Sequence, residues 1–120
     1  MSEGSFLLKS QAYIGGRWVQ AGSKATMDVY NPATGAVVGA VPDMDEADTR
    51  EAIDAASEAL AAWGRLAAKE RAQHMKKWAQ MIVGNVDEIA QILTAEQGKP
   101  LADARHEVLF AASFVEWFAE

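Results

Sequence analysis

The stretch YIGGRWVQAGSKATMDVYNPATG, residues 13–35, holds two turn signals between β-forming runs, and it decides the fold class of this chain. At its start, residues 13–14 and 18–19 are β-formers on either side of Gly15-Gly16. Paired glycines reach the positive φ of the primed turns that close tight hairpins. The sequence therefore predicts a β-hairpin around the glycine pair.

A second hairpin is predicted at the other end of this stretch. Residues 27–30 run into NPATG at residues 31–35, where the Asn side chain, the fixed φ of Pro and the closing Gly all favour a turn. The β-branched run at residues 37–41 returns from the turn, and Pro42 should end it because proline donates no ladder hydrogen bond. We assign residues 11–42 to two hairpins.

From residue 43 to residue 120, apolar side chains recur at spacings of three and four, which is typical of amphipathic helices. Asp45 and Asn85 are good N-caps, and Pro100 can open a helix because the N–H that it lacks would have no partner there. Four helices are predicted: Asp45 to Gly64, about 68–84, Asn85 to Gly98, and Pro100 to the end. The predicted fold class is α+β, two hairpins followed by four amphipathic helices.

The last six residues, VEWFAE at 115–120, include no residue that terminates a helix. Glu116 and Glu120 place negative charge beside the negative pole of the helix dipole, each at a cost of about 0.3–1 kcal/mol. An apolar stripe that includes Val115 and Phe118 is still running at this point. We therefore expect the chain to be a fragment of a longer fold, truncated at residue 120.

Composition argues against several classes of protein. The 120 residues contain no cysteine, and 11 basic against 17 acidic side chains give a net charge of −6. This acidity argues against nucleic acid as a partner, because such binding depends on clustered Lys and Arg. No apolar run approaches the roughly 20 residues that span a bilayer, and residues 1–5 lack the basic start of a secretory signal. We expect no membrane partner and a cytoplasmic location.

The sequence offers few groups for chemistry. Without cysteine there is no thiolate nucleophile, disulfide or Cys-based metal site. His74 and His106 have no His or Cys three or four residues away, so neither belongs to a local metal motif. Gly15-Gly16 fits a hairpin turn better than a phosphate loop. From the residues alone, the chain is a scaffold without an active site.

Two further predictions concern packing and charge. The four tryptophans lie in a strand or on or beside apolar helix stripes, and we expect them to pack in the core. They are Trp18, Trp63, Trp78 and Trp117. Glu96 falls in the last turn of the third helix, where negative charge is disfavoured. It either points into water or has a cation or a donor nearby.

Four segments carry a resemblance to a known family: YIGGRWV at 13–19, VYNPATG at 29–35, EQGKPLA at 96–102 and AASFVEWFAE at 111–120. Their order and spelling resemble the opening of the aldehyde dehydrogenase superfamily. The last two segments resemble in particular its NAD(P)-dependent succinate-semialdehyde dehydrogenase branch. The resemblance covers about residues 12–120.

The resemblance implies that residues 11–120 are the N-terminal part of an α/β, Rossmann-like coenzyme-binding domain, preceded by an arm at 1–10. It implies an enzyme, a homo-oligomer when full length, that uses NAD or NADP to oxidise succinic semialdehyde to succinate. In that chemistry a cysteine thiolate attacks the aldehyde, hydride passes to the coenzyme, and a glutamate-activated water releases the acid. The family carries these groups beyond residue 120. We assign no catalytic or coenzyme-binding residue here and expect the 120-residue chain alone to be inactive.

One family feature maps onto this chain. Many members bind a structural monovalent cation, Na⁺ or K⁺, through backbone carbonyls before the Asn-Pro turn and a carboxylate before the Gly-Lys-Pro segment. The matching positions are Val29, Tyr30 and Glu96, which the resemblance makes candidate cation ligands. A bound cation would offset both the carboxylate charge and the helix dipole at Glu96.

Two alternatives stay open. One is another branch of the same superfamily, and the other is a stand-alone, non-catalytic α+β interaction module on the same scaffold. The coding sequence past Glu120 discriminates between enzyme and module. A cysteine nucleophile, a glutamate base and a glycine-rich strand–turn–helix would indicate the enzyme, and a stop codon would favour the module.

Overall fold

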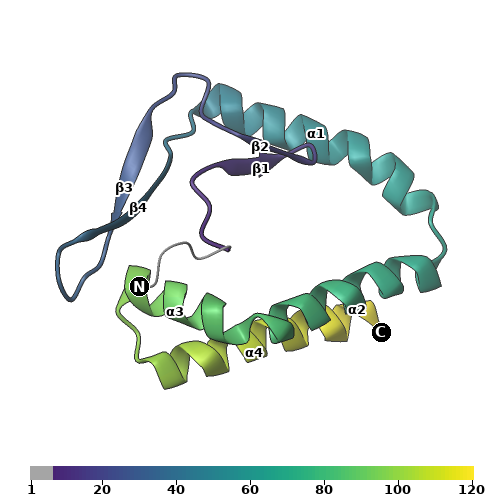
Figure 1. Cartoon of the computed structure of the whole chain (residues 1–120). Helices are drawn as coiled ribbons and strands as arrows, with labels where there is room; N and C mark the ends of the chain where they lie inside the picture. The colour runs from purple at the N-terminus through teal and green to yellow at the C-terminus, as the bar shows by residue number, and fades with distance from the viewer. Residues whose placement is uncertain (1–6) are drawn as a thin grey trace. The chain divides into compact units, whose positions relative to one another are not determined.

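The computed structural model describes residues 7–120, and in that range the chain forms two antiparallel hairpins followed by four helices (Figure 1). This order confirms the predicted α+β class. The strands are β1 (Ala12–Ile14), β2 (Arg17–Val19), β3 (Thr26–Tyr30) and β4 (Val37–Pro42). The helices are α1 (Glu46–Arg65), α2 (Ala68–Gly84), α3 (Val86–Gln97) and α4 (Leu101–Ala119).

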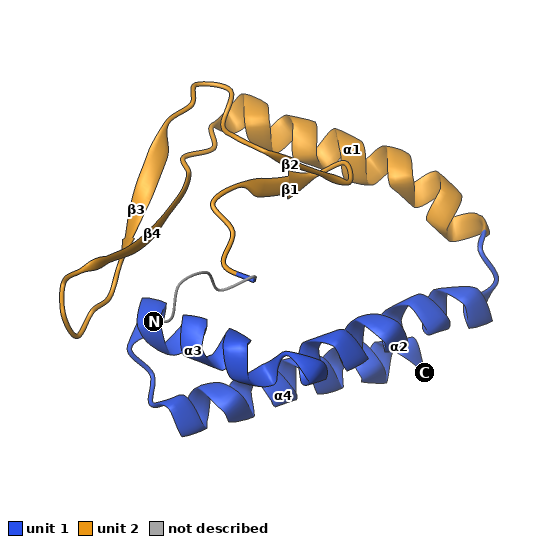
Figure 2. Cartoon of the chain, viewed as in Figure 1, with its two compact units in different colours: residues 1–7, 66–120 blue, residues 8–65 orange. Residues whose placement is uncertain are grey.

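The chain divides into two compact units, which Figure 2 shows in different colours. Residues 8–65, with both hairpins and α1, make up the hairpin unit. Residues 66–120, with α2, α3 and α4, make up the helical unit, to which Leu7 also belongs. The Leu7 N–H donates a hydrogen bond of 2.9 Å to a carboxylate oxygen of Glu88 on α3. Of the arm predicted over residues 1–10, residues 1–6 lie outside the described residues.

The first hairpin closes as its glycine pair predicts. Gly15 and Gly16 have φ of 57° and 78°, the left-handed values that a primed turn requires at both central positions. β1 and β2 pair with Tyr13 opposite Trp18, and the centroids of the two rings lie 5.1 Å apart. The turn residues therefore set both the turn and the strand register.

Reciprocal hydrogen bonds begin α1. The Asp48 N–H donates to Oδ1 of Asp45 at 3.0 Å, and the Asp45 N–H donates to Oδ2 of Asp48 at 3.2 Å. This capping-box arrangement confirms Asp45 as the N-cap. The other oxygen of Asp48 accepts the N–H of Gly22, at 3.0 Å, from the segment between the two hairpins. Asp48 thus ties that segment to the start of α1, which explains why this carboxylate is buried.

Gly64 does not interrupt the first helix, contrary to the prediction. α1 continues through it to Arg65, and the chain leaves helical geometry at Ala67, where ψ is 148°. A glycine weakens a helix by about 1 kcal/mol but does not force it to stop. The helix therefore ends where the next one is capped rather than at the glycine.

Small side chains pack α4 against α2 and α3 in the helical unit. Ala90, Ala104 and Val108 form the buried core, and the flanking aliphatic residues are Ile82, Val86, Ile89 and Leu93. Alanine side chains at these contacts are small and leave room for the helices to approach one another closely.

The helix ends of this unit differ in part from the prediction. The Asn85 side chain does not cap α3. It donates from Nδ2 to the carbonyl oxygen of Met81 at 2.7 Å, in the last turn of α2. The backbone of Asn85 has φ −115° and ψ 18°, which joins α2 almost directly to α3 and lacks the extended ψ of a capping residue. Pro100 precedes α4 as its N-cap residue, and its carbonyl accepts the N–H of Ala104.

The turn from α3 to α4 is fixed by a left-handed residue and by ion pairs. Gly98 has φ 81°, and its N–H donates to the Thr94 carbonyl at 2.9 Å, so it ends α3 as predicted. Ion pairs join Lys99 to Glu107 and Arg105 to Asp87. Across residues 7–120, no helix combines the length and the apolar character that crossing a membrane requires.

Candidate functional site

The predicted cation ligands fall in both units. Val29 and Tyr30 are neighbours in β3 of the hairpin unit. Glu96 lies in α3 of the helical unit. Two of the three candidate residues, Val29 and Tyr30, are therefore neighbours in one strand. Glu96 belongs to the other unit, and its surroundings are described below within that unit.

The ladder between β3 and β4 is irregular beside Val29 and Tyr30. Val29 is opposite Gly39 and Tyr30 is opposite Val37, so Val38 is the extra residue of a β-bulge. A bulge leaves a residue unpaired and disturbs the ladder locally. The unpaired residue is Val38 of β4, and Val29 and Tyr30 of β3 keep their partners Gly39 and Val37. Carbonyl oxygens are also ligands that hard cations prefer.

The turn after these two residues is rigidly hydrogen-bonded. The side-chain oxygen of Asn31 accepts the N–H of Ala33 at 2.9 Å. The backbone of Asn31 donates to the Ala36 carbonyl and accepts from the Gly35 N–H, both at 2.8 Å. The turn thus holds the end of β3 in one conformation, which is the local requirement for a backbone ligand site.

Glu96 is exposed in the last turn of α3, a turn that contains no basic residue. Lys99, which follows the helix closely, pairs with Glu107 of α4. The carboxylate of Glu96 therefore stands beside the negative end of the helix dipole. Water solvates it in the chain as described, and the same exposure leaves its oxygens accessible to a cation.

Few other polar groups converge in the described part of the chain. Within residues 7–120, no three His, Asp or Glu side chains gather closely enough to hold a metal ion. His74 and His106 are both exposed, on α2 and α4.

The tryptophans do not pack in the core as predicted. Their exposed fractions are 48% for Trp18, 36% for Trp63, 58% for Trp78 and 76% for Trp117. Helical spacing shows which side chains share a face, but it does not show whether the chain supplies a second layer to cover that face. The prediction was wrong because it assumed that such a layer lies within these residues.

Sequence reasoning also missed a surface on α4. Four aromatic residues spaced along this helix are at least half exposed, and we call them the aromatic surface: Phe110, Phe114, Trp117 and Phe118. The predicted stripe includes both Val115 and Phe118, but only Val115 is partly buried, and Phe118 is exposed. The available signal was a helix with apolar residues on more than one face, a pattern typical of helices that are covered all round.

Comparisons with known proteins agree with the resemblance. A family model described as "Aldehyde dehydrogenase family" matches residues 18–120. Glutarate-semialdehyde dehydrogenase of Pseudomonas putida is 52% identical over 114 residues, which is 95% of this chain and 24% of that protein. Succinate-semialdehyde dehydrogenase [NADP(+)] of Escherichia coli is 49% identical over 116 residues, 97% of this chain and 24% of that protein.

A solved structure agrees at the level of the fold. The crystal structure of aldehyde dehydrogenase from Brucella melitensis biovar abortus superposes with a TM-score of 0.94 at 53% identity. The match covers 98% of this chain and 24% of that one. This chain therefore spans about a quarter of the length of the proteins that it matches.

Proposed function

The chain belongs to the aldehyde dehydrogenase family, and we propose that it is the N-terminal part of an NAD(P)-dependent enzyme that oxidises succinic semialdehyde to succinate. The observation that carries this proposal is the match of residues 18–120 to the family model, together with near-half identity to a succinate-semialdehyde dehydrogenase. That relative's name specifies NADP(+), which supports a nicotinamide coenzyme.

In this proposal the 120 residues are scaffold rather than catalytic machinery. Aldehyde oxidation of this family type needs a thiolate nucleophile, and the chain contains no cysteine. Its own residues shape and support the coenzyme-binding domain through the two hairpins and the α2–α4 packing. The resemblance supports a homo-oligomer as the complete enzyme. Purified alone, the chain should not reduce NAD⁺ or NADP⁺ with any aldehyde.

Glutaric semialdehyde is the second candidate substrate. The Pseudomonas putida relative that carries this substrate in its name is 52% identical, slightly more than the succinate-specific relative at 49%. The two semialdehydes differ by one methylene, which enzymes discriminate by only about 1–3 kcal/mol. The ratio of kcat/KM for the two aldehydes is therefore the quantity that assigns the substrate.

The test of the proposal is to read the coding sequence beyond the codon for Glu120 and to assay the complete protein that it encodes. We expect a cysteine, a glutamate and a glycine-rich turn downstream, and reduction of NAD⁺ or NADP⁺ with succinic semialdehyde. A preference for glutaric semialdehyde would move the assignment to the second candidate. A stop codon directly after Glu120 would refute the enzyme and leave a non-catalytic interaction module.

We also propose that Val29, Tyr30 and Glu96 contribute oxygen ligands to a structural Na⁺ or K⁺ in the complete enzyme. The resemblance and the exposed carboxylate at the end of α3 support this. Such an ion supplies positive charge at that helix end and takes no part in the reaction.

Thermal unfolding of the complete enzyme in Na⁺, K⁺ and a bulky organic cation, at one ionic strength, tests the cation. The unmodified enzyme should unfold at a lower temperature in the organic cation, and Glu96→Gln should remove that difference. Glu58→Gln, which neutralises an exposed carboxylate on α1, is the matched control and should preserve it. A salt-type difference that survives Glu96→Gln would show that Glu96 is no ligand.

A further inference from the structure

Glu96 has no ion-pair partner, although a lysine follows it closely. The carboxylate is exposed in the last turn of α3, and that turn contains no basic residue. No ion pair within residues 7–120 includes Glu96. Lys99 lies only three residues further on, just beyond the Gly98 cap. An ammonium group is favoured at such a helix end, because it faces the negative pole of the dipole.

The ammonium group of Lys99 is bound instead to Glu107 on α4. Its Nζ donates a hydrogen bond to Oε2 of Glu107, and the exposed fractions of the two side chains are 28% and 46%. Lys99 follows α3, whose negative pole attracts a cation, and precedes α4, whose positive pole repels one. The two dipoles therefore favour α3, and the carboxylate of Glu107 is what draws the ammonium group toward α4.

The backbone on both sides of Lys99 is fixed, so only its side chain can change partners. On one side, Gly98 has φ 81° and its N–H donates to the Thr94 carbonyl at 2.9 Å. On the other side, Pro100 has φ −54° and its carbonyl accepts the N–H of Ala104 at 2.9 Å. These contacts do not involve the Lys99 side chain, and they should persist when it moves.

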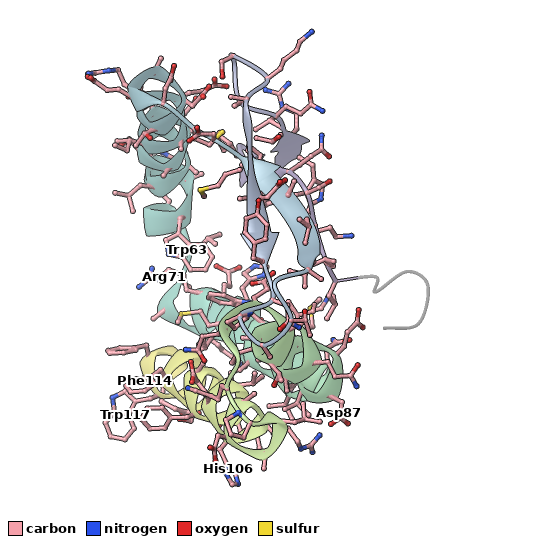
Figure 3. All side chains as sticks on the ribbon, turned by 90° about the vertical axis from the view of Figure 1, so that its left-hand side faces the viewer. Trp63, Arg71, Asp87, His106, Phe114 and Trp117 are labelled. Carbon is pink, nitrogen blue, oxygen red and sulfur yellow. The ribbon has the colours of Figure 1, made fainter. Side chains whose placement is uncertain are left out.

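The other basic groups near the start of α4 leave Glu107 to Lys99. Arg105 pairs with Asp87 of α3, and this pair joins the two helices without Lys99. His106, which precedes Glu107 in sequence, is exposed and extends away from the ribbon of α4 in Figure 3, where Asp87 is also labelled. Loss of the Glu107 charge should therefore release Lys99 without opening the turn between α3 and α4.

We propose that Glu107 is a positioning residue for the cation site: it holds the Lys99 ammonium group away from Glu96 and so keeps that carboxylate free for an external monovalent cation. The inference rests on the proposed cation site and adds the residue that protects it from an internal competitor. A released Lys99 is tethered close to Glu96 and has a high effective concentration there. It then competes with Na⁺ or K⁺ for the same carboxylate oxygens.

The test is Glu107→Gln in the complete enzyme, measured by thermal unfolding in separate titrations of Na⁺ and K⁺. A bulky organic cation keeps the ionic strength constant. The variant should raise the metal-ion concentration at half of the maximal stabilisation about fivefold, because a partly exposed ion pair of the released lysine sets the size of the competition.

Two further variants separate competition from other effects. Lys99→Gln removes the competitor itself and should leave the half-saturating concentration unchanged or lower it. Asp103→Asn removes an exposed carboxylate from the same helix and should keep that concentration within about twofold of the unmodified enzyme. A lysine pair that merely stiffened the turn would make Lys99→Gln and Glu107→Gln equally harmful.

The inference is overturned if Glu107→Gln leaves the half-saturating concentration unchanged, or if Lys99→Gln or Asp103→Asn raises it as much. If Glu107→Gln does not fold, Lys99→Gln decides, since a rise there overturns the inference and an unchanged or lower value supports it. Saturable stabilisation that Glu96→Gln abolishes and Glu107→Gln leaves intact would refute this inference alone. Stabilisation that survives Glu96→Gln, or that the unmodified enzyme lacks, would refute the cation site and this inference with it.

Discussion

Asp48→Ala should loosen the junction between α1 and the segment that links the two hairpins. One carboxylate oxygen accepts the Gly22 N–H at 3.0 Å, the other accepts the Asp45 N–H at 3.2 Å, and the residue is only 9% exposed. Hydrogen bonds to charged groups contribute about 1.5–3 kcal/mol each, and a buried amide left without an acceptor loses about 1–3 kcal/mol. Water can reach part of this site once the side chain is gone, so we expect a loss of about 2–3 kcal/mol in the free energy of unfolding.

Two companion variants make the magnitude interpretable. Asp48→Asn retains one acceptor oxygen and should lose about half as much as Asp48→Ala, because one of the two amides keeps its partner. Asp54→Ala removes the same kind of side chain from an exposed position on the same helix, and it should change stability by less than about 0.5 kcal/mol.

Hydrogen exchange at the Gly22 amide is the most specific assay. A local loss of 2–3 kcal/mol corresponds to exchange about 30-fold to 150-fold faster. Urea unfolding followed by circular dichroism gives the global value beside it. If the Gly22 amide exchanged at the same rate in Asp48→Ala and in Asp54→Ala, the reasoning from these two hydrogen bonds would be refuted.

Three further substitutions can be read by thermal unfolding of the chain. Gly16→Ala should destabilise by about 1–2 kcal/mol, because φ is 78° there and an added Cβ meets no atom within 4 Å, so only backbone strain is tested. Gly39→Ala has the same open space without a left-handed φ, and an equal loss in both would contradict this. Ala67→Ser should stabilise α2 by about 0.5–1 kcal/mol, since the N-cap position has an extended ψ of 148° and no side-chain acceptor. No gain would show that this position does not act as a cap. Arg105→Ala should cost less than about 1 kcal/mol, and less again in high salt, because its ion pair with Asp87 is exposed. A large, salt-independent loss would mean that the pair is more than a surface contact.

The parts of the fold that the sequence could predict are those set by neighbouring residues. Gly15-Gly16 determines a primed turn because few other residues reach its φ values, and the flanking β-formers then have only one register. Gly98 ends α3 for the same reason. Asp45 is recognisable as a cap because its side-chain oxygen accepts the N–H of Asp48, only three residues away. In each case the partners of the interaction lie within a few residues of one another.

The parts that failed depend on distant partners. The hydrogen bond from Gly22 to Asp48 joins residues 26 apart, so no pattern of neighbouring residues indicates it. Asn85 lies between α2 and α3 and could bond to either helix. Its side chain donates a hydrogen bond to the Met81 carbonyl of α2, the preceding helix. The exposed tryptophans show the same limit, because burial of Trp117 depends on a surface beyond its own helix.

Only the resemblance to the family predicts the candidate cation site. Backbone carbonyls leave no mark on the residue type, so nothing in Val29 or Tyr30 themselves indicates a ligand. Glu96 gives one local signal, a carboxylate at the wrong end of a helix, and this signal fits a solvated side chain equally well. The structural feature that supports the proposed site is the exposure of the Glu96 carboxylate at the end of α3.

The most direct measurement of whether this chain is the first quarter of an aldehyde dehydrogenase is the activity of a chimera in which this chain replaces the matching first quarter of the Escherichia coli succinate-semialdehyde dehydrogenase. If the 120 residues provide the scaffold of that family, the chimera should reduce NADP⁺ with succinic semialdehyde at a kcat/KM within about tenfold of the parent, a difference below about 1.4 kcal/mol. A chimera that is folded and binds NADP⁺ but oxidises no aldehyde would contradict that assignment.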